Sequence, residues 1–528
     1  MTIARFFRTG LLAAAALLLA APLPPALAAD SQPSPASEKL PPGIAWFKGD
    51  VDAAFAAAKA SNKPLFLYWG ASWCPYCSQV KATIFNRQAF IERSRHFIPV
   101  YLDGDLASAQ KLGARFRVRG YPSMILFKPD GSEIVRLPGE VDSGRYLQVL
   151  NAGLGASRPF KDTLQSGLAA PATLKPEEWR LLAFHSWESG EDQVIAAKDL
   201  PRTLQRLAQS ASPGEAATRL ALNAMVASAT AKASDAADVD KPAAAARLTK
   251  LLGDPGSARA YSDIFCNSAG ELVKYLAAGD NPQSAALVKT YQAALQKLAA
   301  DQTLSKTDRV NALAAQVAIA RVDSPTGALD AGLVKALRNG VAQADKATTD
   351  QYERQSVVHA ASSALRDAEL LDDSDALLKA ELKRSHAAYY FMSALAANAK
   401  KRGDKTGALN WYEQAYQASK GPATRVQWGA GYANNLLDLA PEDETRIEKT
   451  VDQLVGELAD APDIFYERNA RSLNRLGSKL LAWNKEGKHK AAFDRLHARL
   501  DGVCAKLPAN DGQKAVCQGV LDPKRPAA

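Results

Sequence analysis

Two cysteines three positions apart are the residues of this chain whose types and spacing could do chemistry. They are Cys74 and Cys77, in the stretch "WCPYC" at residues 73–77. Such a pair is a redox centre, half of a zinc site or a small structural loop. A structural zinc site needs four ligands, yet the first histidine of the chain is His96 and the other cysteines lie far away in sequence. A disulfide that closes so short a loop stabilises a fold little. We therefore interpret Cys74 and Cys77 as a redox pair, with no metal and no cofactor.

The elements around the pair predict how it is positioned. Residues 49–64 repeat apolar positions at helical spacing, and Asp50 or Asp52 stands where it can cap a helix. The run "LFLYWG" at residues 65–70 is continuously apolar and aromatic, which is typical of a strand buried on both faces. Helical periodicity resumes at residues 78–85. We therefore expect the two cysteines where a buried strand turns into a helix.

That position assigns different roles to the two cysteines. The start of a helix favours a thiolate because unpaired backbone N–H groups and the positive end of the helix dipole face it. Cys74 should therefore ionise more readily than a free cysteine and act as the nucleophile, while Cys77 should resolve the mixed disulfide. Pro75 suits the first position of the helix. Trp73 and Tyr76 flank the pair and could present an apolar surface to a partner, although simple packing explains Trp73 equally well.

Later residues extend an α/β pattern. We expect a strand at residues 96–105, a helix at 106–116 that closes near Gly113, a hairpin that turns at residues 129–131, and a closing helix at 142–154. This β-α-β-α-β-β-α order predicts parallel strands, an antiparallel hairpin at the end and helices on both faces of the sheet.

Two motifs together resemble a known family. Trp73-Cys74-Pro75-Tyr76-Cys77 is followed by Gly120-Tyr121-Pro122-Ser123 before the hairpin. Residues 42–156 thereby resemble the thioredoxin fold, and most of all the exported thioredoxin-like domains of thiol:disulfide interchange proteins. In that family the proline of the second motif is cis, lies beside the cysteines and follows a residue whose backbone pairs with an extended substrate. The resemblance thus implies substrate-binding roles for Tyr121 and Pro122.

The sequence also departs from this family at one position. Thioredoxins usually carry a buried acid six residues before the first cysteine, where this chain has Tyr68. Proton transfer must then use water or another group. The resemblance therefore does not fix the rate, the reduction potential or the direction of the reaction.

Residues 157–528 change in character. Stretches at helical period alternate with short breaks at glycine, proline and aspartate, which predicts an all-α domain of antiparallel helix pairs that folds on its own. Leu395-Ala396, Gly403, Ala408, Tyr412 and Ala415 stand at the offsets of a tetratricopeptide repeat. Gly487 and Ala492 repeat part of that pattern before it degenerates, so a plain helical bundle remains an alternative.

The three remaining cysteines belong to this helical part. Cys504 and Cys517 are separated by a segment that can turn between two helices. In an exported protein with few thiols, we expect them to form a structural disulfide. Cys266 is then left as a free thiol, which we expect to be buried in a helix as a small apolar residue.

The N-terminus indicates export. Arg5 and Arg8 precede an apolar run that ends at prolines and a small-x-small site, which is typical of a cleaved signal peptide over residues 1–28. Residues 29–41 are interpreted as a linker. No later segment is apolar enough to span a membrane. The formal net charge of +9 is spread among acidic residues without a basic run, so nucleic acid is not an expected partner.

These observations predict a periplasmic thiol:disulfide oxidoreductase. Its partners would be exported proteins that carry disulfides or thiols, and a separate redox protein would supply electrons. The resemblance to interchange proteins favours reduction over oxidation. The helical domain would bind a partner protein. The alternative is a helical-repeat adaptor whose thioredoxin-like domain only senses redox state or anchors a partner.

Overall fold

The computed structural model describes residues 40–187, 194–277, 281–459, 461 and 463–522. The predicted signal peptide at residues 1–28, and all but the last two residues of the predicted linker at 29–41, lie outside these ranges. No helix in the described ranges combines the length and the hydropathy that a bilayer crossing requires.

Four strands in the first part of the chain form a mixed sheet. They are β1 Leu65–Gly70, β2 Ile98–Asp103, β3 Ser123–Phe127 and β4 Glu133–Arg136, in the spatial order β2-β1-β3-β4. Strand β1 pairs parallel with β2 and antiparallel with β3, and β3 pairs antiparallel with β4. All six residues of β1 are buried, as their continuous apolar character predicts. The expected mixed sheet with a terminal hairpin is confirmed.

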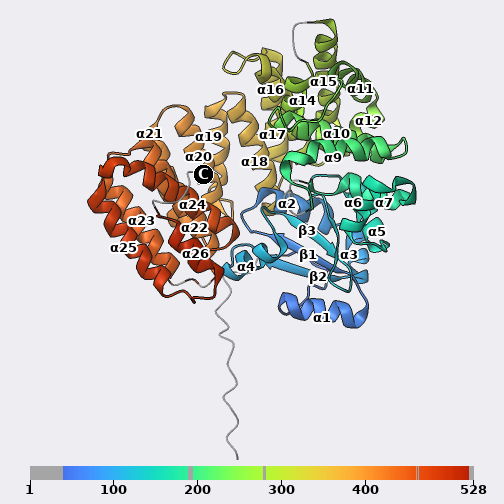
Figure 1. The fold of residues 1–528 in the computed structure, drawn as a ribbon. Coiled ribbons are helices and arrows are strands. Elements are labelled where there is room, and N and C mark those ends of the chain that lie inside the picture. The colour runs from blue at the N-terminus through green and yellow to red at the C-terminus, as the bar shows by residue number, and fades with distance from the viewer. Residues whose placement is uncertain (1–39, 188–193, 278–280, 460, 462, 523–528) are drawn as a thin grey trace, which may run out of the picture. The chain divides into compact units, whose positions relative to one another are not determined.

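Helices cover this sheet, which Figure 1 shows in blue between α1 and α2. Helix α1 begins after Asp50, whose carboxylate accepts from the Ala53 N–H, and α5 begins after Asp142. Helix α4 continues past Gly113 and ends before Arg117, which adopts a left-handed conformation, so the expected end near Gly113 is three residues too early. The elements are α1 Val51–Ser61, α2 Pro75–Val80, the π-helical turn η1 Lys81–Phe85, α3 Gln88–Arg93, η2 Ser94–His96, α4 Ala107–Phe116 and α5 Ser143–Leu154.

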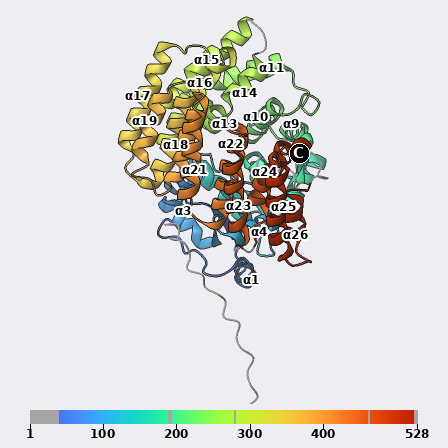
Figure 2. The same cartoon turned by 90° about the vertical axis from the view of Figure 1, so that its left-hand side faces the viewer.

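The remainder of the described chain is helical and contains no strand after Arg136. Its first helices are α6 Phe160–Ala169, η3 Pro171–Thr173, α7 Pro176–Phe184, η5 Ala197–Asp199, α9 Leu200–Ser210, α10 Glu215–Thr230, α11 Lys241–Gly253, α12 Pro255–Ala260, α13 Ser262–Asn267, α14 Ala269–Leu276, α15 Pro282–Ala300, α16 Lys306–Asp323 and α17 Ala331–Ala347. The later ones are α18 Gln351–Asp367, α19 Leu371–Glu381, α20 Ala388–Lys401, α21 Lys405–Ala418, α22 Pro422–Leu439, α23 Glu444–Ala459, α24 Glu467–Trp483, η6 Lys485–Gly487, α25 Lys490–Ala505 and α26 Gly512–Gly519. Figure 2 shows α21–α25 lying beside one another. The predicted fold class, an α/β domain followed by an all-α part, is confirmed.

Helices α20 and α21 pack against each other as a pair. Gly403 makes the turn between them with a φ of 79°, a conformation that suits glycine. Ala396, Ala408 and Ala415, the small residues of the predicted repeat, are fully buried. Small side chains let two helix backbones approach closely. Assignment of these helices to the tetratricopeptide family stays a prediction.

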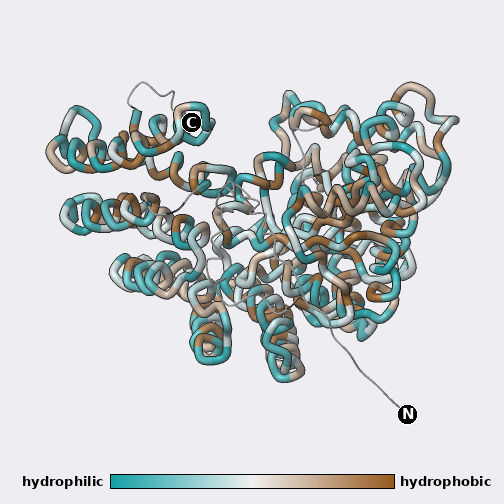
Figure 3. The backbone as a smooth tube through the Cα atoms, turned by 90° about the horizontal axis from the view of Figure 1, so that it is seen from below, coloured by the Kyte–Doolittle hydropathy of each residue, from teal (hydrophilic) through white to brown (hydrophobic). Residues whose placement is uncertain are grey.

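One hydrophobic core is shared by the first domain and the helices that follow it. It includes Ile44 and Tyr68 of the first domain, Val149 of α5, and residues of α6, α7, α9 and α10 as far as Ala224. Hydrophobic and hydrophilic stretches alternate along the helices in Figure 3, as expected of helices with one buried face. The predicted domain boundary near residue 156 stays a prediction, and this shared core runs across it.

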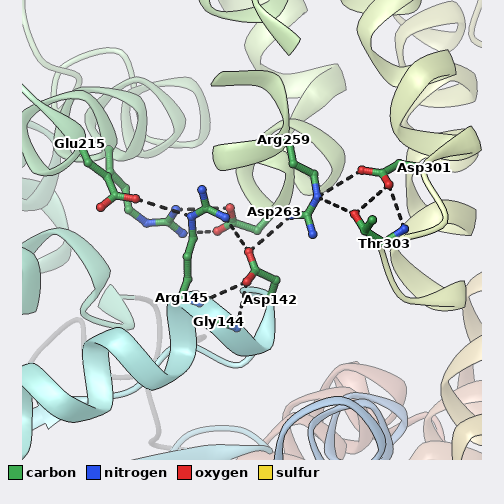
Figure 4. A network of polar contacts seen from close by, with 9 residues as sticks. Asp142, Gly144, Arg145, Glu215, Arg259, Asp263, Asp301 and Thr303 are labelled. Atoms are coloured by element: carbon green, nitrogen blue, oxygen red, sulfur yellow. Dashed lines mark hydrogen bonds and ion pairs between the residues drawn. The ribbon is translucent and has the colours of Figure 1, made fainter. Parts of the chain in front are cut away.

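A network of charged side chains adds to this junction (Figure 4). Asp142, the N-cap of α5, contacts Arg145 Nη1 at 2.6 Å and Arg259 Nη1 at 3.4 Å through its Oδ2. Arg259 Nε also lies 3.2 Å from Asp301 Oδ2, and Arg145 Nε lies 3.5 Å from Glu215 Oε1. Burial raises the pKa of the Asp142 carboxyl, but its hydrogen bonds and the two guanidiniums outweigh burial and hold the pKa below its ordinary value. The network ties α5 to the helical part.

Candidate active site at the Cys74–Cys77 pair

The structure places Cys74 and Cys77 at the junction that the sequence predicts. Strand β1 ends at Gly70, and Cys74 is the N-cap of α2 with Pro75 in the first turn. The two cysteines form a disulfide with Cα atoms 5.2 Å apart. Cys74 Sγ also accepts a hydrogen bond from the Cys77 N–H, with Sγ and N 3.1 Å apart. An N–H aimed at this sulfur would stabilise a thiolate there once the disulfide is reduced.

The pair is covered. Cys77 is fully buried and Cys74 is only 2% exposed. Both belong to a cluster with Ala387, Tyr389 and Ala415, which come from the helical part more than three hundred positions later. The side chains that enclose the disulfide thus come from the region that the sequence assigns to a separate domain.

Trp73 is the centre of this contact. Its indole N–H is 2.8 Å from Asp105 Oδ1 and 3.0 Å from Thr424 Oγ1, and the Thr424 hydroxyl also donates to Asp105. The Tyr390 ring stacks on the indole, with centroids 6.0 Å apart, and the Trp428 ring meets it edge-on at 5.0 Å. Trp73 is therefore packed against the helical part, and its proposed role toward a partner stays a prediction.

The backbone beside Cys74 is also engaged by helices. Gln355 of α18 donates its Nε2 hydrogen to the Trp73 carbonyl oxygen at 2.7 Å. His386 Nε2, just before α20, lies 2.7 Å from the Ser72 carbonyl oxygen. Both carbonyl groups immediately N-terminal to Cys74 are therefore hydrogen-bonded to the helical part.

The second motif lies in the same cluster. The Tyr121–Pro122 peptide bond is cis, as the resemblance implies. Tyr121 packs against the Trp73 cluster, and its hydroxyl accepts a hydrogen bond from Gln110 Nε2 at 2.8 Å. Burial raises the pKa of this hydroxyl to about 12, although the charge of Arg468 acts in the opposite direction. The guanidinium of Arg468, from α24, lies over the Tyr121 ring at 4.9 Å and over the Trp73 ring at 5.4 Å.

Tyr76 behaves differently from its neighbours. It is 46% exposed and is a large hydrophobic side chain at the surface. Its ring meets that of His359 of α18 edge-on at 5.8 Å. Burial, followed by the charge of Arg366, lowers the pKa of His359 to about 4, so this imidazole is neutral at neutral pH.

Two further residues bear on the chemistry. Tyr68, at the position where thioredoxins usually carry an acid, is fully buried in the core, with its ring 4.9 Å from that of Phe85. Cys266 is a free thiol that packs in a different cluster from the redox pair. Burial, with Asp308 and Asp263 nearby, raises its pKa, so it is a poor nucleophile. The other two cysteines, Cys504 and Cys517, form a disulfide between α25 and α26.

Sequence reasoning found the cysteines and the proline motif but not the residues that cover them. Those residues are Asp105, Gln355, His386, Thr424 and Arg468. For Asp105 a signal existed, since β2 pairs with β1 through Gly70 and Asp103 and so brings the next residues to the edge where the cysteines lie. The other four residues are Gln355, His386, Thr424 and Arg468. Nothing in the sequence near them predicts that they contact the first domain.

The first domain is similar in sequence to known proteins. Residues 51–154 match the family described as thioredoxin-like domain. A thiol:disulfide interchange protein DsbD of Pseudomonas fluorescens is 33% identical over 103 residues, which are 19% of this chain and 18% of that protein. A thioredoxin of Mycobacterium tuberculosis is 30% identical over 102 residues, which are 19% of this chain and 84% of that protein. The solution structure of a thioredoxin from Thermus thermophilus is 25% identical in sequence. The match covers 21% of the present chain and 85% of that thioredoxin, with a TM-score of 0.19.

The chain spans under a fifth of the length of the interchange protein, but most of the length of the thioredoxins. A thioredoxin-like domain with Cys74 and Cys77 at disulfide distance has the arrangement of thiol-disulfide oxidoreductases in general. Through residues 51–154, the chain belongs to the thioredoxin family.

Proposed function

We propose that this protein is an exported thiol:disulfide oxidoreductase that reduces disulfides of other exported proteins through Cys74 and Cys77. The observation that carries the proposal is the position of Cys74 at the start of α2, where its sulfur accepts the Cys77 N–H and is bonded to Cys77. A sulfur so placed is the better thiolate of the two once the pair is reduced.

The reaction balances as an exchange of two electrons. The Cys74 thiolate attacks one sulfur of a substrate disulfide, so a Cys74–substrate bond forms, and the other substrate sulfur leaves as a thiolate that takes up a proton. The Cys77 thiol loses its proton and attacks Cys74 Sγ, which releases the second substrate thiol. The substrate is reduced, and Cys74 and Cys77 are oxidised to their disulfide. A dithiol protein must then reduce that disulfide.

The substrate-binding residues would be those around the pair. Tyr121 and Pro122 would offer backbone to an extended substrate segment, by analogy with the resembled family. Trp73 would support that segment, and Tyr76, which is exposed, would also contact it. The helical part would supply the surface that binds the partner protein.

Export and the direction of electron flow belong to the same proposal. The signal-like pattern of residues 1–28 and the similarity to an interchange protein support a periplasmic location and a reducing role. A separate redox protein would deliver the electrons.

The test is redox titration of the intact protein. Equilibration in buffers of reduced and oxidised dithiothreitol, followed by alkylation and mass measurement, should show a reversible two-electron change confined to Cys74 and Cys77. Cys74→Ser should abolish reduction of the insulin disulfides by the protein with dithiothreitol as electron source, whereas Cys266→Ser should leave it intact. A pair that stays oxidised at every dithiothreitol ratio, or a Cys74→Ser variant with full activity, would contradict the proposal.

The adaptor alternative has one observation in its favour, which is that helices cover the disulfide and leave Cys74 only 2% exposed. In that function the pair would change the conformation of the chain but would not turn over. Turnover separates the two: an oxidoreductase reduces many insulin disulfides per molecule, whereas an adaptor exchanges once at most.

A further inference from the structure

A substrate disulfide would reach Cys74 past two motifs, the one at residues 73–77 and the one around Pro122. Side chains from the helical part cover both of them. At the first motif, Gln355 and His386 contact the backbone carbonyls of Trp73 and Ser72 at 2.7 Å each, and Thr424 receives the Trp73 indole N–H. These contacts come from α18, the segment before α20, and α22. They leave Cys74 enclosed rather than presented at the surface.

The proline motif is covered by a different helix. Arg468 of α24 lies over the rings of both Tyr121 and Trp73. Arg471, one turn later, donates from Nη2 to the Arg119 carbonyl oxygen at 3.0 Å. An extended substrate that pairs with the backbone beside Pro122 would have to displace these side chains.

Helix α22 and the segment before α24 contact the first domain at two further points. Ala423 N–H donates to the Asp105 carbonyl oxygen at 3.2 Å, and Lys111 Nζ lies 3.1 Å from Asp463 Oδ1. Each contact is modest on its own, because a net hydrogen bond or partly exposed ion pair contributes only about 1 kcal/mol. We call the side chains of the helical part that enclose the redox pair the cover. The cover is held by these small contacts and by the larger aromatic cluster of Trp73, Tyr390 and Trp428.

We propose that helices α18, α20, α22 and α24 determine which disulfides the pair accepts, and that they do so by size. A small disulfide needs only a local shift of side chains to reach Cys74. A protein disulfide must bring its flanking backbone onto Tyr121 and Pro122, which requires Tyr390, Trp428 and Arg468 to move away from Trp73. The cover thus selects against disulfides in folded proteins until it is opened. This inference rests on the proposed function.

The test compares two substrates in the full-length protein. Trp428→Ala removes one wall of the aromatic cluster, and Gln355→Ala removes the hydrogen bond to the Trp73 carbonyl without removing a large side chain. For each variant, rates are measured with 5,5′-dithiobis(2-nitrobenzoate) as the small disulfide and with insulin as the protein disulfide. Trp483→Ala is the matched control, since Trp483 lies on α24 but stacks on His489, away from the pair.

The expected result is a change in the ratio of the two rates. Trp428→Ala should raise the insulin rate by at least about tenfold, because truncation of a tryptophan packed at a contact surface commonly has effects of that size, while the rate with the small disulfide rises less. Gln355→Ala should also raise the insulin rate more than the rate with the small disulfide, but by smaller factors than Trp428→Ala. Trp483→Ala should leave the ratio of the insulin rate to the small-disulfide rate unchanged. Circular dichroism confirms that each variant is folded.

Two outcomes would overturn the inference and are distinct from each other. If the pair reacts but the ratio is the same in all four proteins, the cover does not select substrates and the proposed function stands. If the pair reacts with neither disulfide in any of the proteins, the proposed function fails and this inference fails with it.

Discussion

At the scale of single residues, the chemistry depends on the difference between two cysteines that are close in sequence and in space. Cys74 stands at the N-cap of α2 and accepts the Cys77 N–H, whereas Cys77 is fully buried one turn further on. The third candidate thiol, Cys266, has a pKa raised by desolvation and, to a smaller extent, by the nearby carboxylates of Asp308 and Asp263. Local placement thus separates a reactive sulfur from two less reactive ones.

The order of alkylation tests this separation. In the fully reduced protein, Cys74 should react with iodoacetamide faster than Cys77 and Cys266 near neutral pH, because only its sulfur lies at a helix start. Peptide mass mapping after short exposures measures the order. A faster reaction at Cys77 would reverse the assigned roles.

His359 makes stability depend on pH at the edge of the site. Its folded-state pKa is about 4, whereas an unfolded histidine titrates near 6.5. Between these two pKa values the unfolded chain binds a proton and the folded chain does not. The free energy of unfolding should therefore fall as the pH drops from about 6.5 toward 4, by up to about 3 kcal/mol. His359→Gln should remove this part of the dependence. Chemical denaturation of both proteins at pH 7.5 and pH 4.5 measures it, and equal losses in the two would contradict the assignment.

At the scale of elements, the start of α22 lies close to the loop after β2. This close approach places Thr424 of α22 against Trp73, beside the redox pair. Gly421, directly before α22, has a φ of 84°, and a Cβ there would lie 2.8 Å from Asp105 Cβ. The approach therefore requires glycine at this position on two counts. Asp105 in turn holds the Trp73 indole.

Gly421→Ala should consequently destabilise the protein by about 1–3 kcal/mol, through backbone strain and the clash with Asp105. It should also make reduced Cys74 more accessible to alkylation, because the contact that fails is the one beside Trp73. Gly403→Ala is the control, since Gly403 also has a positive φ but its Cβ would meet no atom within 4 Å. If the two variants gave the same melting temperature and the same alkylation rate, this view of α22 would be wrong.

The disulfide between α25 and α26 stabilises the C-terminal end of the helical part. Cys504 and Cys517 are 13 positions apart and are both almost fully buried. Removal of this disulfide in the Cys504→Ser/Cys517→Ser double variant should lower the free energy of unfolding by about 3 kcal/mol, which is the value for a loop of this length in the chain-entropy model. Thermal unfolding under oxidising conditions tests this. Insulin reduction by the folded variant should be unchanged.

These elements show what sequence alone could predict. The run "LFLYWG", the cysteine motif and the capping aspartates are local signals, and they predicted β1, α1, α2 and the redox pair. The cover could not be predicted in this way. Thr424 and Asp105 are 319 positions apart, and Gln355 and Trp73 are 282 positions apart. Contacts over such separations depend on how whole helices stack, which periodicity does not specify.

At the scale of the whole molecule, the described residues between Leu40 and Asp522 belong to one compact unit. The shared core from Ile44 to Ala224 and the charged network at Asp142 join the thioredoxin-like domain to the helices after it. The cover of the redox pair joins it to later helices. The sequence-based expectation of a helical domain that folds on its own therefore needs a direct test.

Fragments that end at different points provide it. A fragment of residues 40–156 would expose Val149 and other core residues that pack in one cluster with α6, α7, α9 and α10, whereas a fragment of residues 40–231 would keep these helices. The longer fragment should show the higher melting temperature and the greater resistance to proteolysis. Equal stability of the two fragments would instead support the boundary near residue 156.

The most direct test of the account is to trap the first chemical step in the intact protein. The Cys77→Ala variant, reduced and then exposed to glutathione disulfide, should acquire one glutathione, which peptide mass mapping should place on Cys74. The additional change Cys74→Ala should abolish this adduct. An adduct on Cys266 instead, or no adduct on Cys74 under conditions where glutathione disulfide oxidises free cysteine, would contradict the assignment of Cys74 as the nucleophile.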